Sequence, residues 1–187
     1  MKGCNIVMIG ASTGGLKVLE ELFPRLPVLN AAVIIIQHIT PLVDRSFAKS
    51  LSRVSRMPIS LAEEGTKLHA GQVYLAPGGI HLTLVNNSVV HLHNGEKVNS
   101  VRPSIDVAMK SVSTPFGIKI TGVILTGMGG DGAAGISHIK KMGGVTISQD
   151  QKTSVIYGMP KAAVETGKID FVLPTNRITD KLKELFG

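Results

Sequence analysis

The sequence has 187 residues, of which 43% are hydrophobic, and its formal net charge is +7. This size and a mean hydropathy of +0.25 exclude a disordered chain and predict a compact fold with a buried core. The longest apolar run, Ala31–Ile36, has the length of a strand, so no segment is predicted to span a bilayer. A single cysteine and the lack of a signal-peptide pattern lead us to expect a cytoplasmic protein.

The positive charge bears on the choice of partner. Aromatic residues make up only 4% of the sequence and tryptophan is absent, so side chains on which single-stranded nucleic acid stacks are scarce. We therefore expect no nucleic-acid partner. The charge suits either an acidic protein partner or an ordinary solvated surface.

In the first part of the chain, apolar runs alternate with helical patterns. Near-continuous apolar strands that are each followed by a helix predict a parallel sheet covered on both faces. The predicted elements are a strand at Ile6–Ile9, a helix at Leu16–Leu22, a strand at Ala31–Gln37 and a helix at Asp44–Arg56 with Asp44 as its N-cap.

The middle of the chain differs, because two alternating segments, Ile80–Val85 and Ser88–His93, flank Asn86-Asn87 and predict an antiparallel hairpin. We place this hairpin at the edge of the sheet or over it as a flap. Beyond it we predict a helix from a Ser104 cap to Ser111, a strand at Lys119–Thr126, a helix at Asp131–Met142, a strand at Val145–Ser148, a helix at Pro160–Glu165, a strand at Phe171–Leu173 and a helix at Thr175–Phe186.

Taken together, these elements predict a doubly wound α/β fold, with a mostly parallel sheet flanked by helices and an antiparallel edge hairpin. No internal repeat, low-complexity tract or linker interrupts the sequence, so we expect residues 1–187 to form a single domain.

The first strand ends in the segment Gly10-Ala11-Ser12-Thr13-Gly14, which fits the G-x-S-x-G pattern. A sharp turn from strand to helix at such a site exposes the serine oxygen as a nucleophile. Glycine-rich turns of this kind also bind phosphate, so the pattern alone leaves both interpretations open. A base and an orienting carboxylate elsewhere would favour the nucleophile.

Two further strands end in candidates for those roles. His38 follows Ala31–Gln37, and Asp131 follows Lys119–Thr126 in a glycine-rich segment. Alone, His38 is typical of a loop histidine and Asp131 of a helix N-cap. Because the carboxyl ends of parallel strands meet at one rim, Ser12, His38 and Asp131 are predicted to converge there as nucleophile, base and orienting carboxylate.

A competing interpretation is a dinucleotide-binding module. Gly127–Gly132 fits G-x-G-x-x-G after a strand, and Asp150 follows at the spacing of a ribose-binding acid. This fingerprint usually lies in the first unit of such a fold, whereas here it lies late in the chain. It also leaves Ser12 and His38 without a role.

These motifs, in this order, closely resemble the catalytic domain of the CheB family of protein-glutamate methylesterases. Further segments share the resemblance, which runs from about Ile6 to Leu173: Tyr74-Leu75-Ala76-Pro77-Gly78-Gly79-Ile80-His81-Leu82, Arg102-Pro103-Ser104-Ile105-Asp106 and Ser154-Val155-Ile156-Tyr157-Gly158-Met159-Pro160. The resemblance implies a single catalytic domain without the receiver domain that usually precedes it in the family.

The resemblance also implies the chemistry. It predicts hydrolysis of glutamate γ-methyl esters on the cytoplasmic helices of bacterial chemoreceptors, with release of methanol, and deamidation of certain receptor glutamines. Ser12 is then the nucleophile, His38 the base and Asp131 the orienting carboxylate, while Thr13 and Met128 line the site. The Met128 N–H is the best candidate for an oxyanion donor, and no metal or cofactor is expected.

The helix predicted at Asp44–Arg56 carries cations at helical spacing and no acid beyond its first residue. Such a face is either an ordinary exposed surface or a device that steers the protein toward acidic receptor helices. Its cations are Arg45, Lys49, Arg53 and Arg56.

Overall fold

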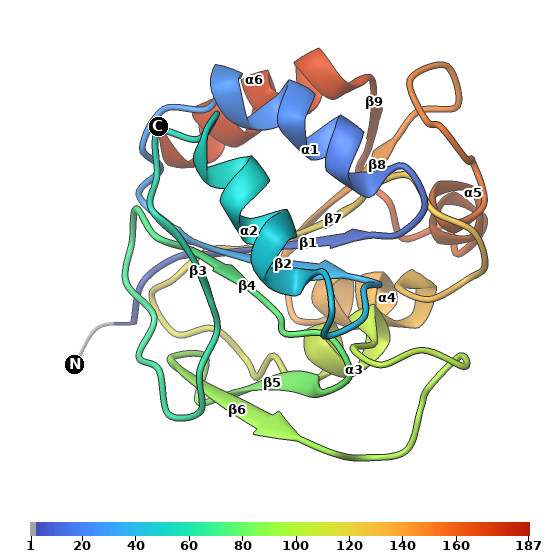
Figure 1. Cartoon of the computed structure of the whole chain (residues 1–187). Coiled ribbons are helices and arrows are strands. Elements are labelled where there is room, and N and C mark those ends of the chain that lie inside the picture. The colour runs from blue at the N-terminus through green and yellow to red at the C-terminus, as the bar shows by residue number, and fades with distance from the viewer. Residues whose placement is uncertain (1–2) are drawn as a thin grey trace.

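The computed structural model describes residues 3–187, which form a seven-stranded, entirely parallel sheet and a separate two-stranded sheet (Figure 1). The strand order in the large sheet is β3-β4-β2-β1-β7-β8-β9. Its strands are β1 (Ile6–Ala11), β2 (Ala32–Gln37), β3 (Ile59–Leu61), β4 (Val73–Leu75), β7 (Ile120–Ile124), β8 (Val145–Gln149) and β9 (Phe171–Leu173).

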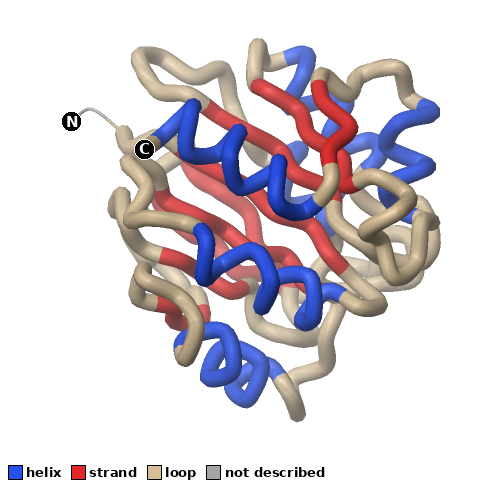
Figure 2. The backbone as a smooth tube through the Cα atoms, turned by 90° about the horizontal axis from the view of Figure 1, so that it is seen from above, coloured by secondary structure: helices blue, strands red, loops and turns tan. Residues whose placement is uncertain are grey.

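Helices cover both faces of this sheet, and Figure 2 shows helices lying over the strands in the view from above. One face carries α1 (Gly15–Leu22), a short 3-10 helix (Phe23–Arg25), α2 (Asp44–Ser52) and α6 (Thr175–Phe186). The other carries α3 (Ile105–Lys110), α4 (Ala133–Lys141) and α5 (Met159–Glu165). The doubly wound fold predicted from the sequence is therefore confirmed.

The two hydrophobic cores follow from the alternation of side chains along each strand. In β1, Val7 and Ile9 point into the core under α1 and α6, whereas Ile6 and Met8 point into the core under α3 and α4. All six residues of β1 are buried, as expected for the central strand of a sheet that is covered on both faces.

The predicted hairpin is present, with β5 (His81–Val85) and β6 (Val89–His93) joined by Asn86 and Asn87. The two asparagines have φ of 51° and 54°, the left-handed values of a type I′ turn. The hairpin forms a sheet of its own instead of extending the edge of the large one. It packs on α3 and closes the second core, to which it contributes Leu82, Leu84 and Val90.

Some local predictions are wrong. Val43, not Asp44, is the N-cap of α2; the Asp44 carboxylate is buried and accepts a hydrogen bond from Gly78 N at 3.2 Å. The helix predicted from Asp131 begins only at Ala133, and its N-cap is Gly132, with φ of 101°. Strands β3 and β4 were missed, because three residues are too few to display a period.

The order of the strands determines where in the sheet the candidate site lies. The chain winds outward from β1 in both directions, so the connections change direction between β1 and β7, where open parallel sheets bind their ligands. In register, Ala11 pairs with Gln37, and Gly10 pairs with Ile124. The residues that follow these three strands therefore lie side by side at one edge of the sheet. Within residues 3–187, no helix is long and apolar enough to cross a membrane.

Candidate active site

A hydrogen-bonded histidine and aspartate, largely shielded from solvent, lie at the carboxyl edge of the sheet. His38, directly after β2, places its ring Nε2 2.7 Å from Oδ2 of Asp131, in the loop between β7 and α4. The side chains are 11% and 3% exposed, respectively. The structure thus brings together two of the three predicted catalytic residues, which lie 93 positions apart in the sequence.

The Asp131 carboxylate is surrounded by further donors. Besides His38, it accepts hydrogen bonds from two side chains and from two backbone N–H groups at the start of α3. Oδ1 accepts from Ser104 Oγ at 2.8 Å, Asn99 Nδ2 at 2.9 Å and Asp106 N at 3.2 Å, and Oδ2 accepts from Ile105 N at 2.7 Å.

The hydrogen-bond donors around the Asp131 carboxylate determine its charge. Burial by itself raises the pKa of a carboxyl group, because it removes water from the charged form. Here the hydrogen bonds from His38, Ile105 N, Asn99 and Ser104 outweigh burial and lower the pKa of Asp131 from 3.8 to about 2. Asp131 is therefore anionic at neutral pH, the state needed to hold the N–H of an imidazole.

Ser12 lies at the end of β1, fixed by hydrogen bonds on several sides. Its N–H donates to Thr126 O at 3.0 Å, and its carbonyl accepts from Gly15 N at 2.9 Å and Gln37 Nε2 at 2.8 Å. A Cβ at Gly127 would lie 2.7 Å from the Ser12 Cβ, so only glycine leaves room for the serine there. The turn that the G-x-S-x-G pattern predicts is therefore held rigidly between the loops after β2 and β7.

The orientation of the His38 ring determines which of its nitrogens can accept a proton from Ser12. Because Nε2 faces Asp131, Nδ1 is the nitrogen left to accept a proton. No hydrogen bond joins Ser12 Oγ to the His38 ring among residues 3–187. Contacts between catalytic groups are often long without substrate, and tighten in the complex.

The two predicted site-lining residues flank Ser12. Thr13 follows it directly, and Met128 follows Gly127; both side chains are exposed, Met128 at 72%. The N–H groups of Thr13 and Met128 donate no hydrogen bond within the described part of the chain. Ser12 is partly exposed, and two available N–H groups beside such a serine are the usual components of an oxyanion hole.

The geometry disfavours the dinucleotide alternative. A pyrophosphate would sit at the N-terminus of α4, but the carboxylate of Asp106 is already there. Its Oδ1 accepts from Gly132 N at 2.9 Å and from Gly135 N at 2.7 Å. Asp150 is engaged by Thr153, whose N and Oγ1 donate to its carboxylate at 3.0 and 2.6 Å. Gly132, the last glycine of the fingerprint, thus serves a buried carboxylate of the protein itself.

Sequence reasoning missed several side chains of this site. Gln37, which holds the Ser12 carbonyl, was noticed only as the neighbour of His38. Ser104 and Asp106 belong to a segment that carries the family resemblance, but Ser104 was interpreted only as a helix cap. No local signal in the sequence pointed to Asn99.

Comparison with known proteins agrees with this architecture. The family model for CheB methylesterase matches residues 7–182. The chain belongs to the CheB methylesterase family. The Thermotoga maritima CheB methylesterase catalytic domain superimposes with a TM-score of 0.92 at 39% identity, covering 99% of this chain and 100% of that one. The family resemblance inferred from the sequence is thus confirmed.

Relatives named protein-glutamate methylesterase/protein-glutamine glutaminase are similar over most of the chain. The protein from Pyrococcus horikoshii is 46% identical over 178 residues, which are 93% of this chain and 48% of that protein. The one from Symbiobacterium thermophilum is 42% identical over 183 residues, 97% of this chain and 51% of that protein. The chain therefore spans about half the length of these CheB-family relatives.

The low pKa of Asp131 predicts how stability depends on pH. A carboxyl group with a pKa of about 2 when folded and 3.8 as a model value stabilises the fold above about pH 4, and loses this contribution as the pH falls to about 2. The Asp131→Asn variant lacks this contribution. The free energy of unfolding of the wild type minus that of the variant should therefore decrease by about 2 kcal/mol between about pH 5 and pH 2. Urea unfolding at several pH values measures this.

The matched control for this experiment is Asp180→Asn, which removes an exposed carboxylate on α6. It should retain the pH dependence of the wild type. An Asp131→Asn variant whose stability follows the wild-type pH curve would contradict an ionised, hydrogen-bonded Asp131.

Proposed function

We propose that the protein is a serine hydrolase that removes methyl esters from glutamate side chains of bacterial chemoreceptors and also deamidates receptor glutamines. The observation that carries this proposal is the rigid turn at Ser12 beside the buried pair of His38 and anionic Asp131. The names of the relatives, which give both activities, support the same conclusion.

In the proposed reaction, His38 Nδ1 takes the hydroxyl proton of Ser12 as Oγ bonds to the ester carbonyl carbon. The carbonyl oxygen becomes an oxyanion, and the N–H groups of Thr13 and Met128 are placed to bind it; one such donor typically lowers a barrier by about 3 kcal/mol. When the intermediate collapses, the bond to the methoxy group breaks, and methanol leaves with the proton from His38. The product of this step is a glutamyl ester of Ser12.

Water then completes the cycle. His38 removes a proton from water as its oxygen bonds to the acyl carbon, and the proton returns to Ser12 Oγ when that bond breaks. The receptor glutamate side chain is released as a carboxylate, and the hydroxyl of Ser12 is regenerated. A glutamine side chain gives the same acyl intermediate with ammonia as the leaving group, so a single site serves both activities. Asp131 remains ionised throughout, and stabilises the imidazolium through Nε2.

Replacing Ser12 tests this proposal most simply. The Ser12→Ala variant should keep its fold, because the hydroxyl makes no hydrogen bond to the His38 ring, and it should lose methanol release from methylated receptors. It should also lose covalent labelling by a fluorophosphonate probe, which reacts with activated serine hydroxyls. Ser88→Ala, in the distant hairpin, should behave as wild type. Methanol release at the wild-type rate from folded Ser12→Ala would refute the proposed nucleophile.

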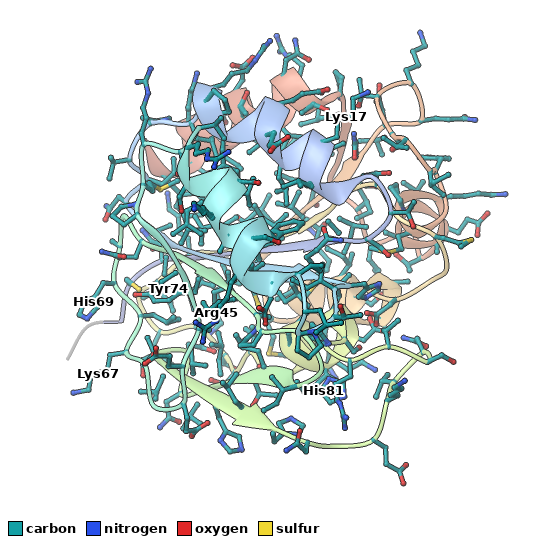
Figure 3. The ribbon with its side chains drawn as sticks, in the orientation of Figure 1. Lys17, Arg45, Lys67, His69, Tyr74 and His81 are labelled. Carbon is teal, nitrogen blue, oxygen red and sulfur yellow. The ribbon has the colours of Figure 1, made fainter. Side chains whose placement is uncertain are left out.

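The surface of α2 supports an acidic protein substrate. Arg45, Lys49 and Arg53 are exposed on α2 and at its C-cap, and Figure 3 shows Arg45 on this helix. Arg56, also exposed, lies beyond the helix, because α2 ends at Ser52 and not at Arg56 as the sequence predicted. Because α2 begins just beyond His38, its positive field reaches the approach to the site. We infer that these cations steer the protein toward acidic receptor helices.

Reversing charge on α2 tests the steering. A variant with Lys49→Glu and Arg53→Glu should demethylate receptors several-fold more slowly at low salt, and approach the wild-type rate at high salt, because ions screen exposed charges. The matched control reverses Lys110 and Lys141, which are exposed on α3 and α4, the helices of the other face of the sheet. Equal rates for the α2 variant and wild type at every ionic strength would count against steering.

A further inference from the structure

Two buried carboxylates interlock the N-termini of α3 and α4. Asp131 lies just before α4 and accepts hydrogen bonds from Ile105 N and Asp106 N, at the start of α3. Asp106 lies in the first turn of α3 and accepts from Gly132 N and Gly135 N, at the start of α4. Each helix thus supplies the anion for the N-terminus of the other, where the helix dipole favours negative charge.

One side chain connects the two carboxylates. Asn99 Nδ2 lies 2.9 Å from Oδ1 of Asp131 and 2.9 Å from Oδ2 of Asp106. An amide nitrogen carries two protons, so both of its donors are used, one on each carboxylate. The carboxylates are 3% and 5% exposed, whereas Asn99 is itself exposed, so its side chain covers them from the solvent side. Without the amide, their mutual repulsion would be less well balanced.

The backbone around Asn99 is arranged to deliver this amide. Asn99 and Ser100 have φ of 52° and 65°, and the N–H and carbonyl groups of Val98 and Val101 pair across them at 3.2 and 3.1 Å. Left-handed backbone at two successive non-glycine residues is unfavourable, although asparagine tolerates it better than most residues. A tight two-residue turn therefore holds the Asn99 amide between the two carboxylates.

We propose that Asn99 is a positioning residue for the esterase reaction. By donating to Oδ1, it fixes the plane of the Asp131 carboxylate, and thereby the direction in which Oδ2 holds His38 Nε2. Ser104 and Ile105 N also hold Asp131, so loss of Asn99 displaces the carboxylate partially instead of freeing it. A displacement of this kind in catalytic geometry is expected to lower turnover about 10-fold to 100-fold. This inference rests on the proposed function.

The test uses substitutions that separate the side chain from the turn. Asn99→Gly keeps the left-handed turn, because glycine adopts positive φ without strain, but it removes the amide. Asn99→Asp keeps the shape but replaces the donor with a third carboxylate. We expect Asn99→Gly to lower kcat about 10-fold to 100-fold with KM within about twofold of wild type, and Asn99→Asp to lower kcat further. The assays are methanol release from a peptide containing glutamate γ-methyl ester, and the rate of fluorophosphonate labelling.

A close control exists in the hairpin. Asn87, which unlike Asn99 is buried, also has a positive φ, of 54°, and uses its side-chain amide to bind Ser113 N and O, each at 2.9 Å. Asn87→Gly should therefore lose stability without a change in kcat. Wild-type kcat in Asn99→Gly, or an equal loss in the two glycine variants, would overturn the inference. If Asn99→Gly does not fold, the test uses Asn99→Ser, which keeps one donor. Its kcat should lie between those of wild type and Asn99→Asp. A wild-type kcat in Asn99→Ser would overturn the inference equally.

The same assays separate this inference from the proposed function. If Ser12→Ala retains turnover and labelling, the assignment of Ser12 as the nucleophile is refuted, independently of the results for the Asn99 variants. If Ser12→Ala is inactive and Asn99→Gly turns over as wild type, only the role of Asn99 is refuted.

Discussion

The site depends on keeping one buried carboxylate ionised. Removing Asp131 from water raises its pKa and carries a large free-energy penalty unless hydrogen bonds replace the lost solvent. Five donors do so: the His38 ring, two backbone N–H groups of α3, and the side chains of Asn99 and Ser104. The start of α3, the start of α4 and the turn at Val98–Val101 are therefore arranged around a single charge. The same charge fixes the ring of His38.

The sheet brings the other groups to this charge. Because β1 lies between β2 and β7, the residues after these three strands are neighbours, although they are far apart in the sequence. Close packing then sets the distances: Gly127 leaves space for Ser12, and a Cβ at Gly15 would collide with Gln37 Oε1 at 2.1 Å. These two glycines thus allow the turn at Ser12 to pack closely against Gln37 and the segment after β7.

The sequence predicted the fold and the strand ends well, because long apolar strands and glycine-rich turns are local signals. It placed the start of the following helix at Asp131, whereas Gly132 is the N-cap there, and the Asp131 carboxylate instead accepts a hydrogen bond from Ile105 N at the start of α3. Asp106 and Asn99 were missed because their contacts with α4 and Asp131 span 26 to 32 positions and leave no periodic pattern. The short strand Ile59–Leu61 and the buried Asp44 were likewise decided by tertiary contacts.

The central claim is that anionic Asp131 holds the Nε2–H of neutral His38 and leaves Nδ1 free to act as the base. Nitrogen-15 and proton NMR of the chain labelled at histidine tests this directly, at a pH at which the imidazole ring is neutral. The account predicts a protonated Nε2, with a slowly exchanging, strongly downfield proton, and an unprotonated Nδ1. A proton on Nδ1, or a rapidly exchanging Nε2–H like that of an exposed histidine, would contradict it.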